Sequence, residues 1–224
     1  MCNDAVLEFV GRVLGPTQVE GRAVLEVGAR DVNGTARTFV EPLRPASYLG
    51  VDIIPGPGVD EVLSVDHLLT RFGEDAFDVV ICTEVLEHVA DWRSAVTALK
   101  GVVRPGGAVV LTTRSEGFPY HGYPRDFWRL SVEDLRRIFA DFEMRALELD
   151  PSSPGVFLHA VKVGGRRVVD LGGVTLYSVV RRRRVVEEPG LGPIATAVRV
   201  TPRRVALWLG GWLALARRRL PPRR

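Results

Sequence analysis

The chain has 224 residues, of which 46% are hydrophobic and 25% charged, a composition typical of a folded domain and not of a disordered or collagen-like chain. Its two cysteines, Cys2 and Cys82, are far apart and form no CxxC or Cys/His spacing, so we expect no disulfide framework, no zinc site and no other metal. The apolar run at 205–216 is shorter than the roughly 18 residues that a membrane span needs, and no basic leader opens the chain, so we expect a cytoplasmic protein.

The net charge of +3 is unevenly distributed along the chain. Residues 1–160 contain 15 basic and 24 acidic side chains, whereas residues 161–224 contain 15 basic and 3 acidic ones. A basic segment after an acidic body indicates that the segment has its own partner, serves solvation, or lies on an acidic face of the body. Charge alone leaves all three alternatives open.

The first predicted element is a helix at about 3–14, which Gly15 and Pro16 end. Short and nearly continuous apolar runs then predict strands covered on both faces, at 22–28, 46–53, 77–83 and 108–113, with one more at 61–65. Helix-length segments lie between them, at 33–41, 66–73 and 94–103. Because strands alternate with helices, we expect right-handed crossovers and a parallel sheet.

An aromatic-rich loop, EGFPYHGYPRDFW at 116–128, follows the strand at 108–113. SVED at 131–134 predicts a capping box and a helix that buries Leu135, Ile138 and Phe139. Strands at 142–149 and 156–163 complete an α/β domain with a doubly wound, Rossmann-like, seven-stranded and mostly parallel sheet. We expect this domain to comprise residues 1–163, and residues 164–224 to form a basic C-terminal extension that packs on the body or serves at an interface.

The stretch VLEVGARDVNG at 24–34 runs from a strand through a glycine turn toward a helix. Such a turn directs backbone N–H groups to the carboxyl end of a parallel sheet, where doubly wound folds bind ligands, although an ordinary strand-to-helix turn has the same pattern. Glu26, still on the strand, suits a ligand with positive charge better than a pyrophosphate. Asp52 ends the second strand, where a carboxylate can accept both hydroxyls of a ribose, and Asp66 follows the third strand, placed for an adenine amino group.

The order LEVG, YLGVDI, SVDHL, FDVVICTEVLEHV and RPGG resembles the class I S-adenosylmethionine-dependent methyltransferases, in particular their small-molecule, type 11-like branch. The resemblance covers about residues 20–163 and depends on the whole series of motifs. It implies S-adenosylmethionine as the cofactor and a small molecule as the methyl acceptor. Carried over by position, it implies cofactor contacts at Glu26 and Gly28 (methionine part), Asp52 (ribose), Ile53, Asp66 and His67 (adenine), and Thr83 and Glu84 (near the sulfonium).

Arg30 departs from the pattern of the family, because it stands where the loop usually has its second glycine. An arginine adopts the left-handed backbone of glycine only at a cost, so we expect Asn33 and Gly34 to supply that geometry instead. The Arg30 side chain is then expected to pair with Glu26, to bind the cofactor carboxylate, or to block the pocket.

The candidate catalytic residues are His121, His88 and Glu84. A hydroxyl nucleophile must lose a proton, and a histidine is a base suited to neutral pH. For His88, the alternative is a structural role in the turn after the fourth strand. Its neighbour Glu87 is expected to be solvated.

The loop at 116–128 is the expected acceptor site, with Tyr120, Tyr123, Arg125 and Trp128 as candidate substrate-binding residues. Aromatic rings there would stack on a flat acceptor. The alternatives are that Phe127 and Trp128 belong to the core under the SVED helix and that Arg125 ties the loop down by an ion pair.

The function that we predict is O-methylation of a hydroxyl on a small molecule such as a sugar or a secondary metabolite. One alternative is an inactive methyltransferase-like binding module, which Arg30 favours; another is a membrane- or nucleic-acid-associated protein that acts through its tail.

The segment at 203–219, with Trp208 and Trp212 between arginines, is a candidate for binding to the membrane surface. Nucleic acid is not expected as a substrate, because the body is acidic and CTEVLEH has no Asn/Asp-Pro-Pro-aromatic signature. The oligomeric state is not predicted.

Overall fold

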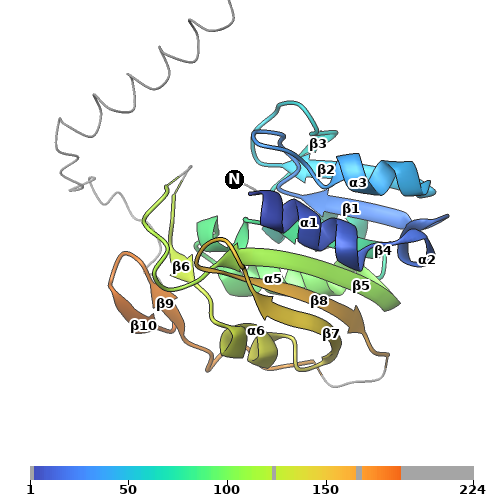
Figure 1. Ribbon diagram of the computed structural model, residues 1–224. Coiled ribbons are helices and arrows are strands. Elements are labelled where there is room, and N and C mark those ends of the chain that lie inside the picture. Colours follow the sequence, from blue (N-terminus) through green and yellow to red (C-terminus); the bar gives the residue numbers. More distant parts are fainter. Residues whose placement is uncertain (1–2, 123–124, 165–167, 188–224) are drawn as a thin grey trace, which may run out of the picture. The chain divides into compact units, whose positions relative to one another are not determined.

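The computed structural model of the protein describes residues 3–122, 125–164 and 168–187. A seven-stranded sheet with the order β3-β2-β1-β4-β5-β8-β7 forms its centre (Figure 1). The strands are β1 Ala23–Val27, β2 Ser47–Asp52, β3 Glu61–Val62, β4 Phe77–Thr83, β5 Val103–Arg114, β7 Phe142–Leu149 and β8 Gly155–Lys162. The first five pair in parallel, whereas β8 runs antiparallel to both β5 and β7. The predicted seven-stranded, mostly parallel sheet is thus confirmed.

Helices cover both faces of this sheet. They are α1 Asp4–Val13, α2 Pro16–Val19, α3 Arg37–Val40, α4 Leu68–Phe72, α5 Trp92–Val102 and α6 Val132–Ile138, with 3₁₀ turns η1 Glu41–Leu43, η2 Val65–His67 and η3 Leu86–His88. Successive strand residues belong to opposite cores: Val24 packs in the cluster that contains α1 and α3 residues, and Leu25 in the cluster that contains α4, α5 and α6 residues. Burial on both faces is the reason for the continuous apolar runs in the strands.

Several predicted boundaries move in the structure. The Arg-Pro-Gly-Gly segment, expected to lie between a helix and a strand, is part of β5, and the pairing with β4 shifts register there, between the pairs Phe77–Val103 and Val79–Ala108. The predicted helices at 33–41 and 66–73 are each a short helix joined to a 3₁₀ turn. The capping box is confirmed: the Ser131 hydroxyl accepts from the Asp134 amide at 3.1 Å, and the Asp134 carboxylate accepts from the Ser131 amide at 2.8 Å.

A second, small sheet takes one strand from between β5 and β7 in the sequence and two from after β8. It has the order β10-β9-β6, with β6 Trp128–Arg129, β9 Leu176–Ser178 and β10 Arg183–Val185 in antiparallel pairs. Leu171, Val174 and Leu176 are buried in the main core, so residues 168–187 belong to the same compact unit as the large sheet. The domain boundary after residue 163 stays a prediction, and the segment at 203–219 lies outside the described residues.

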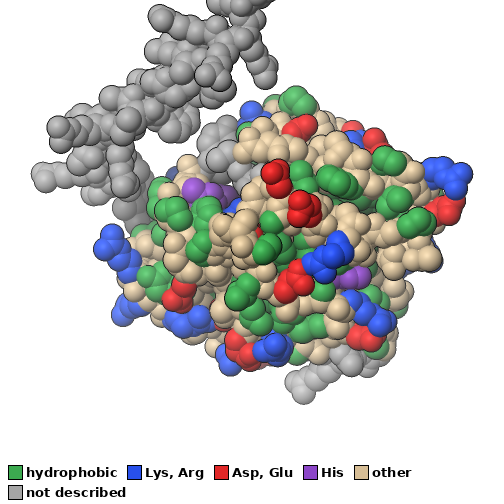
Figure 2. Space-filling view, in the orientation of Figure 1, with side chains coloured by type: hydrophobic (Ala, Val, Ile, Leu, Met, Phe, Trp, Pro, Cys, Tyr) green, Lys and Arg blue, Asp and Glu red, His purple; other side chains and the backbone are tan. Residues whose placement is uncertain are grey.

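The surface of the body mixes charges of both signs on the face that Figure 2 shows. The ion pairs Arg71–Glu61 and Arg12–Glu148 join charges of opposite sign at the surface. Among the helices of the described segments, none combines the length and the apolar character that crossing a bilayer requires.

The contact that fastens residues 168–187 to the body predicts an effect on stability. The Arg93 guanidinium donates to the carbonyls of Leu171 at 2.9 Å and Val174 at 2.6 Å, and it stacks over Trp92 at 4.6 Å. We expect Arg93→Ala to lower the free energy of unfolding by about 1.5 to 3 kcal/mol, since bonds to charged groups are the stronger ones. Urea unfolding measures this, with the surface variant Arg136→Ala as control, expected within about 0.5 kcal/mol of wild type. Equal losses in the two variants would contradict the assignment.

Candidate active site

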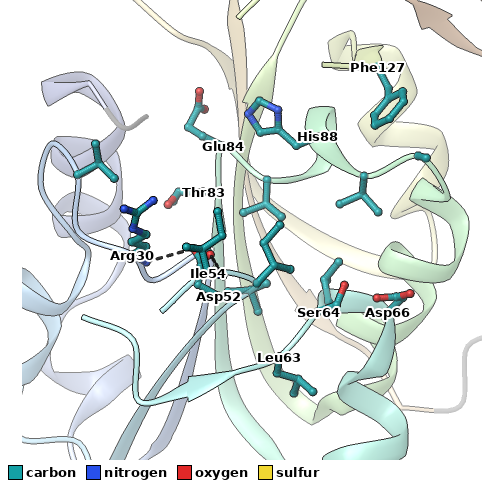
Figure 3. Close-up of a pocket in the computed structure, with 18 of the residues that line it drawn as sticks. Arg30, Asp52, Ile54, Leu63, Ser64, Asp66, Thr83, Glu84, His88 and Phe127 are labelled. Carbon is teal, nitrogen blue, oxygen red and sulfur yellow. Dashed lines mark hydrogen bonds between the residues drawn. The ribbon is translucent and has the colours of Figure 1, made fainter. Parts of the chain in front are cut away.

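A cavity of about 490 Å³ lies at the carboxyl ends of β1, β2 and β4, the edge where parallel α/β sheets bind ligands (Figure 3). Nine of the candidate cofactor-binding and catalytic residues line it: Gly28, Arg30, Gly34, Asp52, Ile53, Asp66, Thr83, Glu84 and His88. Most of the apolar lining was not predicted from the sequence, including Ile54, Leu63, Val85 and Val89. The positions of Ile54, Leu63 and Val85 just after strand ends were the available signal, because side chains there face the same edge.

The turn after β1 confirms the left-handed geometry that was expected of Gly34. The same expectation for Asn33 is wrong, because Asn33 is not among the described non-glycine residues with a positive φ angle. Gly28 and Gly34 have positive φ angles, 81° and 108°, whereas Arg30 is not among the described non-glycine residues with positive φ. A Cβ on Gly28 would lie 2.4 Å from the Val85 side chain, so this position is closed to larger residues. The turn therefore changes direction at its two end glycines and accommodates Arg30 between them.

Glu26 lies behind this turn and not in the cavity. Its carboxylate is buried and accepts hydrogen bonds from the Thr35 hydroxyl at 3.0 Å, the Ala36 amide at 3.0 Å and the Tyr48 hydroxyl at 2.8 Å. Burial raises the pKa of Glu26, and these hydrogen bonds oppose the rise. Glu26 thus joins β1, β2 and the start of α3, and its expected contact with the methionine part of a cofactor stays a prediction.

Asp52 faces the cavity from the end of β2. One carboxylate oxygen accepts from the Ile54 amide at 2.9 Å and the other from the Arg30 amide at 3.3 Å (Figure 3). The next residue, Ile53, is half exposed and lines the cavity. Asp66 is exposed at another part of the lining, whereas His67, also exposed, does not line the cavity.

The Arg30 side chain lines the cavity from the turn after β1. It passes close over Gly56, where an added Cβ would come within 2.9 Å of the Arg30 Nε atom. Glu26 accepts its hydrogen bonds from Thr35, Ala36 and Tyr48. Arg30, which was expected as a partner of Glu26, is not one of these donors.

Thr83 and Glu84 are buried at the end of β4 and reach the cavity. Glu84 has a left-handed backbone, φ 58°, a conformation that is costly for a side-chain-bearing residue and gathers at functional sites. Its carboxylate accepts from the Thr112 hydroxyl at 2.9 Å and pairs with Arg114, which also contacts Asp150 at 3.1 Å. Burial, assisted by the charge of Glu87, raises the pKa of Glu84 to about 7, against the effect of Arg114.

Glu87 is completely buried, so the expectation that it is solvated was wrong. One carboxylate oxygen accepts from the Thr113 hydroxyl at 2.9 Å. The other lies 3.8 Å from His121 Nε2 and 4.0 Å from His88 Nε2, too far for hydrogen bonds but close enough for strong attraction. Burial would raise the pKa of Glu87, but the two histidines outweigh burial and hold the pKa below its ordinary value.

His88 and His121 are 33 positions apart in the sequence but lie side by side in the structure. The centres of their rings are 4.8 Å apart. His88 lines the cavity, whereas His121 does not. His121 Nδ1 lies 3.0 Å from Asp126, which Arg129 holds from the other side at 2.5 Å. Burial alone would lower the pKa of His121. The carboxylates of Asp126 and Glu87 together have the larger effect and raise the pKa to about 9.

The candidate acceptor residues lie in different surroundings. Tyr120 is 60% exposed, and Arg125 is exposed while its carbonyl contacts His88 Nδ1. Trp128 has no exposed surface and donates its indole N–H to the Val89 carbonyl at 2.9 Å, which favours the core alternative. Phe127 is buried and lines the cavity, and Tyr123 lies outside the described residues.

Comparisons with known proteins agree with this geometry. A family profile described as a methyltransferase domain matches residues 3–150, most of the chain. The chain belongs to this methyltransferase family. The resemblance that the sequence motifs indicated is thereby confirmed.

Two relatives of this methyltransferase are ubiquinone biosynthesis O-methyltransferases. That of Vibrio atlanticus is 33% identical over 110 residues, which cover 44% of this chain and 46% of the relative. That of Alkalilimnicola ehrlichii is 32% identical over 127 residues, which cover 50% and 48%. The chain therefore spans about half the length of these curated relatives.

Among solved structures, the methyltransferase resembles the 1,6-didemethyltoxoflavin-N1-methyltransferase of Burkholderia thailandensis, crystallised with 1,6-didemethyltoxoflavin and S-adenosylhomocysteine. The TM-score is 0.58 at 17% identity, with 72% of this chain and 80% of the other covered. At that identity the likeness shows the fold.

The buried carboxylate behind the turn predicts a stability effect. In Glu26→Gln, an amide NH₂ group would face donors that now bind a carboxylate, so we expect the free energy of unfolding to fall by about 1 to 3 kcal/mol. Tyr48→Phe, which removes one donor to Glu26 and leaves the carboxylate, should cost about 1 kcal/mol. Chemical denaturation compares the two, and a Glu26→Gln protein as stable as wild type would argue against this account of the turn.

Proposed function

We propose that this methyltransferase uses S-adenosylmethionine to methylate a hydroxyl group of a small molecule. The observation that carries the proposal is the cavity of about 490 Å³ at the carboxyl ends of β1, β2 and β4, with the Asp52 carboxylate facing it. The volume falls in the range of about 300 to 1,000 Å³ that small-ligand sites occupy. The match to O-methyltransferases supports oxygen as the methylated atom.

The residues around the cavity suit an adenosine with a positive charge. Each Asp52 oxygen accepts one backbone N–H and has a further lone pair for a ribose hydroxyl. Ile53, Ile54 and Leu63 offer apolar contact for a flat base. Thr83 and Glu84 reach the cavity at the end of β4, where the sulfonium would lie, and the Glu84 carboxylate is itself paired with Arg114.

S-adenosylmethionine would supply an activated methyl group, so that the hydroxyl oxygen bonds to the methyl carbon as the carbon–sulfur bond breaks and its electron pair returns to sulfur. The contribution of the protein is mainly alignment of the acceptor oxygen with that methyl group. The hydroxyl proton must leave, and His88, at the lining, is the candidate to receive it. His121 lies behind it, within a pair of carboxylates that accommodate added positive charge.

A binding module without turnover remains the second candidate, because Arg30 replaces a loop glycine. Two observations weigh against a blocked pocket. The side chain of Arg30 lies over Gly56, and the cavity keeps its volume of about 490 Å³ with Arg30 present. We propose instead that the Arg30 guanidinium binds the carboxylate of the cofactor, a pairing that its geometry favours.

The assignment of Asp52 predicts a loss of cofactor affinity. We expect Asp52→Asn to bind S-adenosylmethionine about 10-fold more weakly or worse, because hydrogen bonds to a charged acceptor are lost. Isothermal titration calorimetry measures this, with Glu143→Gln, exposed on β7, as the control that keeps wild-type affinity. Equal affinity of Asp52→Asn and wild type would remove Asp52 from the site.

Arg30 gives a prediction whose sign separates the alternatives. If the guanidinium binds the cofactor carboxylate, Arg30→Ala should weaken S-adenosylmethionine binding about 10-fold, and Arg30→Lys less so. Tighter binding by Arg30→Ala would mean that the side chain obstructs the pocket.

A screen of methyl transfer from labelled S-adenosylmethionine to sugars, phenols and other hydroxyl compounds tests turnover. Cofactor binding without transfer to any acceptor would favour the binding module.

A further inference from the structure

Three side chains at the rim of the cavity form a cluster suited to a metal ion. One potential ligand atom from each of Glu87, His88 and His121 lies within 4.8 Å of the other two. Glu87 Oε1 is 3.8 Å from His121 Nε2 and 4.0 Å from His88 Nε2. Ligand atoms at about 2.0 to 2.2 Å from a divalent ion lie roughly 3 to 4 Å apart, so the cluster needs only small movements to close around one.

Each of these side chains is held through the atom that faces away from the cluster. The second oxygen of Glu87 accepts from Thr113, and Nδ1 of His121 lies 3.0 Å from Asp126. Nδ1 of His88 contacts the carbonyl of Arg125. Outer partners of this kind orient the ligands of metal sites and leave the inner atoms free for the ion.

Two of the inner atoms face each other without a hydrogen bond. Glu87 Oε1 and His121 Nε2 are buried and make no hydrogen bond with the described protein atoms. A buried carboxylate oxygen without a hydrogen bond is unfavourable, so a positive charge between these atoms would stabilise the arrangement. A proton on His121 and a metal ion are the two cations that could supply the charge.

We propose that Glu87, His88 and His121 bind one divalent transition-metal ion, with Mn²⁺ and Zn²⁺ as the representative probes. Two imidazoles and a carboxylate are donors that such ions accept, whereas Mg²⁺ and Ca²⁺ prefer oxygen alone. Three protein ligands leave coordination positions open, and His88 brings the site to the lining of the cavity.

The role of this ion rests on the proposed function. At the rim of the cavity, an acceptor hydroxyl would occupy an open coordination position. With the ion bound, His88 is a ligand and does not act as the base proposed above. The ion would lower the pKa of the acceptor hydroxyl, so that the oxygen attacks the methyl carbon more readily as its proton leaves to solvent. The metal therefore selects acceptors whose hydroxyl can reach the rim formed by His88.

Calorimetry with the full chain, treated with a chelator and free of S-adenosylmethionine, tests the site. Titration with Mn²⁺ should reveal one ion per chain. His88→Asn and His121→Asn should each weaken binding at least 10-fold, as loss of a ligand costs no less than loss of an outer partner. His67→Asn, an exposed histidine outside the cluster, should keep the affinity. The proposal is overturned if neither Mn²⁺ nor Zn²⁺ binds wild type, or if both cluster variants bind as wild type does.

A second measurement needs no substitution, which matters because Glu87 is completely buried and its surroundings could misfold when altered. In wild-type protein, substoichiometric Mn²⁺ should broaden the imidazole NMR signals of His88 and His121 before those of His67 and His159. Broadening of another histidine first, or of none, contradicts the site.

Methyl transfer separates this proposal from the function on which it rests. Transfer that persists at full rate after chelation, in a protein without metal binding, leaves the methyltransferase and removes the ion. Saturable Mn²⁺ binding in a protein that binds no S-adenosylmethionine supports the site and removes the proposed function. Transfer that falls at least 10-fold on chelation and returns with added Mn²⁺ supports both.

Discussion

Two carboxylates hold the turn after β1, and the cavity depends on them. From behind, Glu26 accepts hydrogen bonds from Thr35, Ala36 and Tyr48, and so joins the turn to α3 and β2. From the cavity side, Asp52 accepts the Arg30 amide. Because the turn is fixed on both sides, its backbone forms a wall with a defined shape before any ligand binds, which lowers the entropy cost of binding. Glu26 and Asp52 thus have a structural role, because they hold the turn that forms one wall of the cavity.

A second set of charges lies deeper, along the ends of β4 and β5. Glu84 pairs with Arg114, and Arg114 with Asp150. Beside them, Glu87 faces the histidine pair. Burying a charged group is unfavourable unless it has a partner of opposite charge. Removal of one partner leaves the remaining charge buried with its full desolvation penalty. Of these buried charges Glu84 lines the cavity, and Glu87 lies against the lining residue His88, which indicates a functional reason for their presence.

The sheet could be predicted from the sequence because strands covered on both faces are continuously apolar, as Val79, Val80 and Ile81 are. Asp52 and Gly28 could be predicted because the ends of parallel strands meet at one edge. The burial of Glu87 could not, since it depends on Thr113 and His121, which no local pattern connects with it. The strands β6 and β9 are only two and three residues long and pair across a long separation, so periodicity carries no signal for them. Trp128 is ambiguous in sequence for a similar reason: only its neighbours decide whether an aromatic ring is core or surface.

The most direct measurement is a crystal structure of the protein soaked with S-adenosylhomocysteine. The account predicts the nucleoside in the cavity at the ends of β1, β2 and β4, with both ribose hydroxyls at the Asp52 carboxylate and the amino-acid end near Arg30. A cavity that stays empty at saturating concentration, or one that the Arg30 guanidinium fills, would contradict it.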